Sequence, residues 1–184
     1  MNVMLDLETL STQPNASIVA IGAVYFDNKG VYDTFYRAID PQSSAPLARH
    51  IEPRTVMWWL AQDKAAQEAL YTGENVDILT ALDAFSVFYF GAGISDGGGA
   101  NVWGNGAGFD NVILRSSYDA ANTASPWGVR NDRCFRTLVG MLTPAQAALL
   151  WAKNKQGTAH NALDDAVSQA KVAVDVCEQL GISL

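Results

Sequence analysis

The chain has 184 residues, 49% of them hydrophobic and 17% charged, a composition typical of a globular domain and not of a disordered chain. Its net charge of −7 argues against a protein that coats nucleic acid nonspecifically, but does not exclude an enzyme acting on a nucleic-acid end. No apolar run has the length of a membrane span, and two distant cysteines, Cys134 and Cys177, argue against a disulfide framework or a zinc site. We therefore expect a single domain over residues 1–184, in the cytoplasm, with no membrane partner.

The first third of the chain has the pattern of an antiparallel sheet. Residues 3–8 form an apolar run that predicts a strand, and residues 17–27 are apolar and β-branched, which predicts a second strand. Residues 28–30 are a hairpin turn signal, after which residues 31–39 predict a returning third strand.

The rest of the chain has mainly helical patterns. A further short strand is expected at residues 101–104. The predicted loops are residues 9–15, 40–52, 95–99 and 122–130. The predicted helices are residues 53–61, 64–70, 76–90, a segment from about 109, 133–141, 144–153 and about 162–180.

Asp6 and Glu8 lie two residues apart on the first predicted strand. Side chains alternate along a strand, so these two carboxylates share one face while Val3, Leu5 and Leu7 point into a core. Two neighbouring carboxylates repel each other, and a divalent cation such as Mg²⁺ or Mn²⁺ is their natural counter-charge. Acidic residues on a solvent-facing strand are also common, so this pair alone leaves a purely structural role open.

Asp110 follows a glycine-rich turn between a predicted strand and a predicted helix. Residues 105–108 (Asn-Gly-Ala-Gly) have the glycine content of a phosphate-binding loop but lack the Lys-Ser/Thr of a P-loop. The alternative is that the glycines only permit a tight turn and that Asp110 is a favourable acid in the first turn of a helix.

His160 precedes the last predicted helix, which has Asp164 and Asp165 in its opening turns. A lone histidine is more often structural than catalytic, and both acids have a simple explanation as partners of the helix dipole. If His160 were helical, Asp164 at i+4 would share its face better than Asp165 at i+5. The choice between the two acids therefore depends on whether His160 lies in the loop.

Three motifs, taken in order, resemble those of the DEDDh branch of the DnaQ-like exonucleases. Residues 6–9 (Asp-Leu-Glu-Thr) resemble the first motif, and residues 105–110, in which the aspartate follows a phenylalanine, resemble the second. Residues 160–166 (His-Asn-Ala-Leu-Asp-Asp-Ala) are similar to the third, His-x-Ala-x-x-Asp. Residues 55–60 further resemble a small phage and bacterial subgroup of the exonuclease A type.

The resemblance implies a ribonuclease H-like α/β fold, with a mixed five-stranded sheet whose first three strands are antiparallel and which is flanked by helices. It implies a metal-dependent 3′-5′ exonuclease that releases nucleoside 5′-monophosphates from single-stranded DNA or RNA ends. Two Mg²⁺ or Mn²⁺ ions, about 3.5–4 Å apart in such mechanisms, would stabilise the attacking and leaving oxygens. Their ligands would be Asp6, Glu8, Asp110 and Asp165, and His160 would be the general base for water.

Substrate contacts are less well defined by the motifs. In the family, residues just after the first motif hold the 3′-terminal nucleotide, so Thr9 and Leu10 are candidates, although many relatives have a different residue at the position of Leu10. Trp58 and Trp59 are candidates for stacking a base. The alternative is that at least one of the neighbours Trp58 and Trp59 belongs to the core.

Phosphate contacts are expected from Arg133 and Arg136, two cations in an otherwise acidic protein. Asn105 would either contact a phosphate or cap its turn. Ala162 is small, which would let a metal or substrate approach the last helix.

Other functions remain open at this stage. An oligoribonuclease-like scavenger of short RNA and a nuclease-fold module that binds nucleic acid or a partner without cutting would share this pattern, although all five motif positions are filled. No motif reports on the 2′-hydroxyl that distinguishes RNA from DNA. The resemblance also suggests a homodimer, and a bacterial cytoplasm or, for a phage-encoded chain, that of the host.

Overall fold

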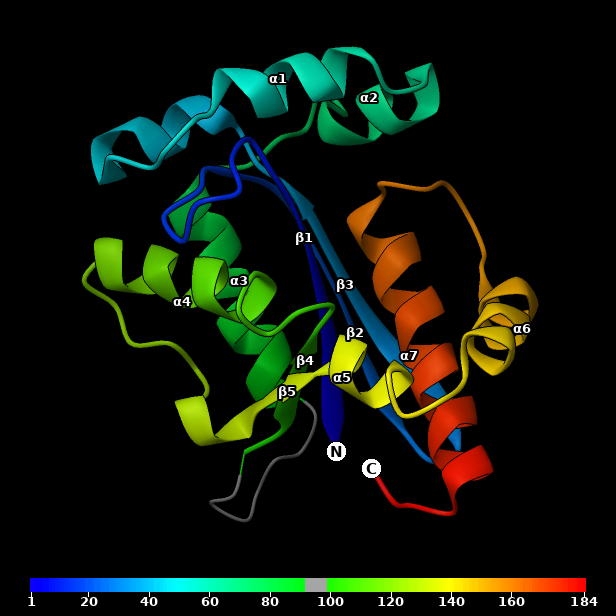
Figure 1. Cartoon of the computed structure of the whole chain (residues 1–184). Helices are drawn as coiled ribbons and strands as arrows, with labels where there is room; N and C mark the ends of the chain where they lie inside the picture. The colour runs from blue at the N-terminus through cyan, green and yellow to red at the C-terminus, as the bar shows by residue number, and fades with distance from the viewer. Residues whose placement is uncertain (92–98) are drawn as a thin grey trace.

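The computed structural model describes residues 1–91 and 99–184, so that most of the predicted loop at 95–99 lies outside the described residues. A single sheet runs through the middle of the molecule (Figure 1). Its strands in the order β3-β2-β1-β4-β5 are β3 (Gly30–Ala38), β2 (Ile18–Asp27), β1 (Asn2–Thr9), β4 (Asn101–Gly104) and β5 (Asp132–Cys134).

The sheet is mixed, with β1 at its centre. β1 pairs antiparallel with β2, and β2 antiparallel with β3, whereas β4 runs parallel to β1 and β5 runs parallel to β4. This arrangement confirms the five-stranded sheet with an antiparallel opening meander. Because β1 and β4 are parallel, their carboxyl ends meet at the same edge of the sheet.

Helices cover both faces of the sheet. Helices α3 and α4 lie on one face, and α5, α6 and α7 lie on the other, while α1 and α2 lie beyond the end of β1 (Figure 1). Two hydrophobic cores result, since Val3, Leu5 and Leu7 pack toward α3 and α4, and Met4 packs with α7. The helices are α1 (Pro53–Leu60), α2 (Lys64–Leu70), α3 (Ile78–Gly91), α4 (Asp110–Ala120), α5 (Phe135–Val139), α6 (Pro144–Asn154) and α7 (Ala162–Leu180).

Some predicted boundaries are wrong. The expected helix at 133–141 begins instead as strand β5, and only Phe135–Val139 is helical. The predicted loop at 40–52 contains the short 3₁₀ helix Pro41–Leu47, and the predicted loop at 122–130 overlaps the short 3₁₀ helix Val129–Asn131. A strand of three residues has no periodicity to detect, and its neighbour β4 places it in the sheet. Within residues 1–91 and 99–184, no helix combines the length and the apolar character needed to cross a membrane.

The start of α7 lies directly on strand β2. Asn161 caps this helix, because its side-chain oxygen accepts hydrogen bonds from the backbone N–H groups of Leu163 and Asp164. A Cβ atom on Gly22 would lie 2.2 Å from the backbone of Ala162, which itself is fully buried. The missing side chain of Gly22 therefore lets the backbone of α7 pack tightly against the sheet. The expectation that Ala162 is small so that a metal or substrate can approach the last helix stays a prediction.

We expect Gly22→Ala to destabilise the protein by about 3 kcal/mol or more, because the added methyl group would meet backbone atoms that cannot move without shifting α7. Chemical denaturation would measure this change. Gly108→Ala is the matched control, since a Cβ atom there has no neighbour within 4 Å, and we expect a change below about 1 kcal/mol. Equal stabilities of the two variants would contradict the close packing of α7 on β2.

Candidate active site

The five motif residues meet at the carboxyl end of the central strand. Asp6 and Glu8 lie on β1, on the face covered by α7, and Asp110 is the first residue of α4. Asp165 lies in the first turn of α7, and His160 lies in the loop before it. All five line one cavity of about 340 Å³.

Side chains and backbone from distant parts of the chain hold two of these carboxylates in place. The backbone N–H of Leu7 donates to Asp110 Oδ1 at 3.2 Å. Gln169 Nε2 donates to Asp6 Oδ1 at 2.8 Å, and Gln169 itself is buried. The first motif is thus tied both to the start of α4 and to the second turn of α7.

In the third motif, Asp165 and Asp164 accept hydrogen bonds from different backbone groups. His160 is not helical: its φ is 63°, in the left-handed region, and its backbone N–H donates to Asp165 Oδ2 at 3.0 Å. Asp164 Oδ2 instead accepts from the backbone N–H of Thr158 at 2.8 Å. Asp165 therefore lines the acidic cavity, while Asp164 stabilises the loop that leads to His160.

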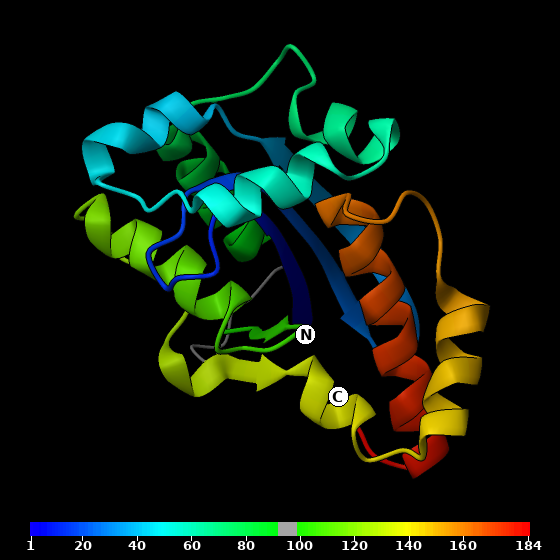
Figure 2. The same ribbon diagram turned by 45° about the horizontal axis from the view of Figure 1, so that its top comes forward.

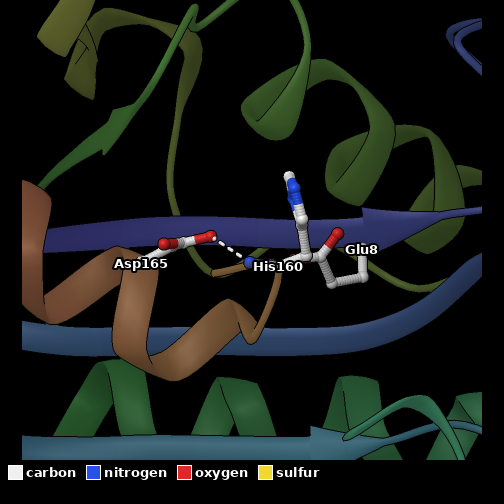
Figure 3. A group of neighbouring side chains, drawn as sticks. All are labelled: Glu8, His160 and Asp165. Carbon is white, nitrogen blue, oxygen red and sulfur yellow. Dashed lines mark hydrogen bonds between the residues drawn. The ribbon is translucent and has the colours of Figure 1, made fainter. Parts of the chain in front are cut away.

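Glu8, His160 and Asp165 form a compact group. One potential ligand atom from each of the three lies within 4.8 Å of the others. Figure 3 shows the hydrogen bond from the His160 backbone to Asp165, with the imidazole ring pointing away from that carboxylate. This geometry leaves the ring free of Asp165 and close enough to the acids to serve either as a base or as a ligand.

The carboxylates repel one another in a poorly solvated site. Burial, followed by the charges of Asp110 and Glu8, raises the pKa of Asp6 well above its ordinary value. Burial, then Asp165 and Asp110, raises the pKa of Glu8 from 4.5 to about 9. Burial raises the pKa of Asp110 to about 7 and also raises the pKa of Asp165.

This donor set fits divalent cations. Four carboxylates share one cavity, and none of the three ion pairs formed among the described residues includes any of them. Hard oxygen ligands are those that Mg²⁺ and Mn²⁺ prefer, and a bound cation would lower the raised pKa values and remove the repulsion.

We expect Glu8→Gln to stabilise the metal-free protein at pH 8. The folded-state pKa of Glu8 is about 9, above its ordinary 4.5, so its protonated form is favoured by folding. The stabilisation that protonated Glu8 contributes to the folded protein is therefore fully present below about pH 4.5 and is lost as the pH rises toward 9. Thermal unfolding in chelator should show Glu8→Gln melting higher at pH 8 and converging with wild type near pH 4.5.

The control for this measurement is Glu74→Gln, which removes a negative charge from an exposed loop. We expect it to change neither the melting temperature nor its dependence on pH. Identical pH profiles for wild type and Glu8→Gln would show that the site does not strain the metal-free protein.

The two tryptophans of α1 have different surroundings. Trp59 is buried, and its indole N–H donates to the carbonyl of Thr9 at 2.9 Å, which confirms that one of the pair belongs to the interior. Trp58 is 44% exposed and has its ring centroid 5.0 Å from that of His160. A second pocket, of about 440 Å³, is lined by both tryptophans together with Glu8 and Thr9.

The other predicted substrate contacts lie in three different places. Arg136 and Asn105 line the acidic cavity, and the Arg136 guanidinium donates to the Asn105 carbonyl at 2.8 Å. Leu10 lines neither of the two pockets, and its backbone pairs with Ser17 and Glu52. Arg133 also lies outside both, because its guanidinium donates to backbone carbonyls of its own segment, including that of Asp132.

The motifs did not identify Gln169 or Trp151, which also line the acidic cavity. A signal existed for Gln169, because it lies one helical turn after Asp165 and so shares its face. Glu52, in the second pocket, lies just before α1 and carried no sequence signal, whereas Thr55 of the same pocket begins the segment 55–60 that resembles the exonuclease A type.

Comparison with known families gives one match over nearly the whole chain. The model of the Rv2179c-like 3′-5′ exoribonuclease domain matches residues 1–177. A comparison with curated proteins found no match.

Solved structures of low sequence identity share the fold. The nuclease domain of 3′hExo, a DEDDh family member bound to rAMP, has a TM-score of 0.66 and 12% identity, over 96% of this chain and 91% of that one. Exonuclease X in complex with 5′ overhanging duplex DNA has a TM-score of 0.61 and 19% identity, over 98% and 93%. A 3′-exonuclease solved for 3′-end specific recognition of a histone mRNA stem-loop has a TM-score of 0.65 and 14% identity, over 99% and 83%.

These structures share the ribonuclease H-like arrangement of strands and helices described above. The family match identifies the activity of the chain as that of a 3′-5′ exonuclease. The chain therefore belongs to the Rv2179c-like 3′-5′ exoribonuclease domain family and is a 3′-5′ exonuclease that has the fold of DEDDh nucleases.

Proposed function

We propose that this exonuclease removes nucleoside 5′-monophosphates from the 3′ ends of single-stranded RNA. The observation that carries the proposal is the convergence of Asp6, Glu8, Asp110, Asp165 and His160 on one cavity. RNA is favoured over DNA because the matching family is described as an exoribonuclease domain, and one structural neighbour is bound to rAMP.

The roles within the site follow from the donor types. Asp6, Glu8, Asp110 and Asp165 would hold two Mg²⁺ or Mn²⁺ ions, which supply charge stabilisation at the attacking and leaving oxygens. His160 would accept a proton from the attacking water through its imidazole. Arg136, exposed at the rim of the same cavity, would bind a phosphate oxygen.

The second pocket would bind the terminal nucleoside. It adjoins the acidic cavity, because Leu7, Glu8 and Phe109 line both. A scissile phosphate beside the carboxylates would leave its 3′ nucleoside next to Thr9 and the Trp58 indole. Apolar and aromatic walls of this kind bind a nucleobase without sequence preference.

The proposal extends to the compartment and the assembly of the enzyme. We propose a cytoplasmic enzyme, since Cys134 and Cys177 are both free thiols and suit a reducing compartment. The homodimer, the single-domain organisation and the resemblance to the exonuclease A type remain predictions. An oligoribonuclease-like preference for very short RNA is distinguished from general exonuclease activity by the lengths that the enzyme leaves uncut.

The test uses 5′-labelled single-stranded RNA and DNA of one sequence, incubated with Mg²⁺ or Mn²⁺. We expect a ladder of products shortened from the 3′ end, nucleoside 5′-monophosphates as the released product, and faster cleavage of RNA. Binding of RNA without any shortening would favour the non-cleaving module. Faster cleavage of DNA would overturn the proposed substrate, and internal cuts without a ladder would overturn the exonucleolytic mode.

A further inference from the structure

Helix α1 is fixed to the strand that carries the first motif. It crosses the carboxyl end of β1 and reaches the start of α7 (Figure 2). The buried hydrogen bond from the Trp59 indole to the Thr9 carbonyl, 2.9 Å long, holds the helix there. Trp59 is only 5% exposed, so this contact is sheltered from water and anchors α1 one residue after Glu8.

The anchored helix presents Trp58 to the imidazole of His160. The two ring centroids lie 5.0 Å apart with the planes at 83°, an edge-to-face arrangement. Such a pair contributes about 0.5–1.5 kcal/mol beyond the area that it buries. Trp59 adds a longer contact with the same ring, 6.1 Å between centroids at 85°.

His160 needs this support because its backbone conformation is unfavourable. A non-glycine residue in the left-handed region, here with φ of 63°, costs about 1–3 kcal/mol and persists only where surrounding groups hold it. Asp165 holds the backbone through the His160 N–H. Among the described residues, the His160 ring makes aromatic contacts with Trp58 and Trp59 alone.

Trp58 also borders the pocket proposed for the terminal nucleoside, so it contacts both that pocket and the imidazole. We propose that Trp58 is a positioning residue, which holds the His160 ring in place for proton transfer. This inference rests on the proposed role of His160 as the general base. It differs from base stacking, in which Trp58 would affect substrate affinity and not the chemical step.

The experiment compares two substrates, in Mn²⁺: bis(p-nitrophenyl) phosphate, a phosphodiester without a nucleobase, and single-stranded RNA. We expect Trp58→Leu, which keeps an apolar side chain but removes the ring, to lower kcat by about 10²-fold on both substrates, the usual cost of misplacing a catalytic group. Trp58→Phe should restore most of the rate. Met57→Ala is the control, since Met57 is 64% exposed on the same helix, and should behave as wild type.

A loss confined to KM for RNA, with normal hydrolysis of bis(p-nitrophenyl) phosphate, would overturn the inference and assign Trp58 to base stacking. The pair Trp58→Leu and His160→Ala adds a second criterion. If Trp58 acts through His160, the double variant should be no slower than His160→Ala alone, because the two residues act as one unit. Additive losses would overturn the inference only, whereas a fully active His160→Ala would overturn the proposed general base as well.

Discussion

Asp165→Asn is expected to remove nearly all turnover. Asp165 lines the acidic cavity and is proposed as a ligand of the divalent ions, whose stabilisation of the transition state is worth several kcal/mol. Losing it therefore corresponds to a fall in kcat of about 10³-fold or more. The amide oxygen of asparagine can still accept the hydrogen bond that the His160 backbone N–H donates to Asp165, 3.0 Å away, so the loss is expected from the missing ligand charge and not from a displaced loop.

Asp164→Asn is the matched control, because it makes the same chemical change one residue earlier. Asp164 accepts from Thr158 N–H and does not line the acidic cavity, and the amide oxygen of asparagine can accept that hydrogen bond. We expect this variant to keep most of its activity. Steady-state hydrolysis of labelled RNA by both variants decides the matter, and an inactive Asp164→Asn beside an active Asp165→Asn would reverse the assignment.

His160→Ala should lower kcat by about 10²–10⁴-fold, the usual cost of removing a general base. Its affinity for Mn²⁺ should persist, since the four carboxylates are proposed as the ligands. The Mn²⁺ affinity distinguishes a base from a ligand at His160, because potential ligand atoms of Glu8, His160 and Asp165 lie within 4.8 Å of one another.

The measurement pairs RNA turnover with Mn²⁺ titration calorimetry on wild type and His160→Ala. His50→Ala serves as the control for loss of an imidazole, because His50 Nδ1 is hydrogen-bonded to Ser11, away from both pockets. A variant that has lost its Mn²⁺ affinity would show that His160 is a ligand. One that turns over normally would show that it is not the base.

Local patterns were enough to predict the elements that carry the first motif. Alternation along residues 3–8 predicted that Asp6 and Glu8 share a face opposite Val3 and Leu5, and the core assignments agree with this. The turn at residues 28–30 predicted the hairpin between β2 and β3. These features depend on neighbours in the sequence, so the sequence contains them directly.

Features that depend on distant partners could not be predicted in the same way. β5 is a strand because β4 pairs with it, and the close packing of α7 on the sheet depends on Gly22 of a distant strand. The left-handed conformation of His160 and its contact with Trp58 result from tertiary packing. Helical spacing alone favoured Asp164 as the partner of a helical His160, and only the loop geometry shows that Asp165 bonds to it.

The central claim is that the carboxylate cluster works as a divalent metal site. Its most direct test is the cleavage of 5′-labelled RNA after exhaustive chelation, followed by titration with Mn²⁺, for wild type and Asp6→Asn. We expect no cleavage without metal, recovery in wild type together with a rise in melting temperature, and neither effect in Asp6→Asn, since metal that binds only the folded site must stabilise it. Full activity in the chelated enzyme, or recovery of Asp6→Asn equal to wild type, would contradict the account.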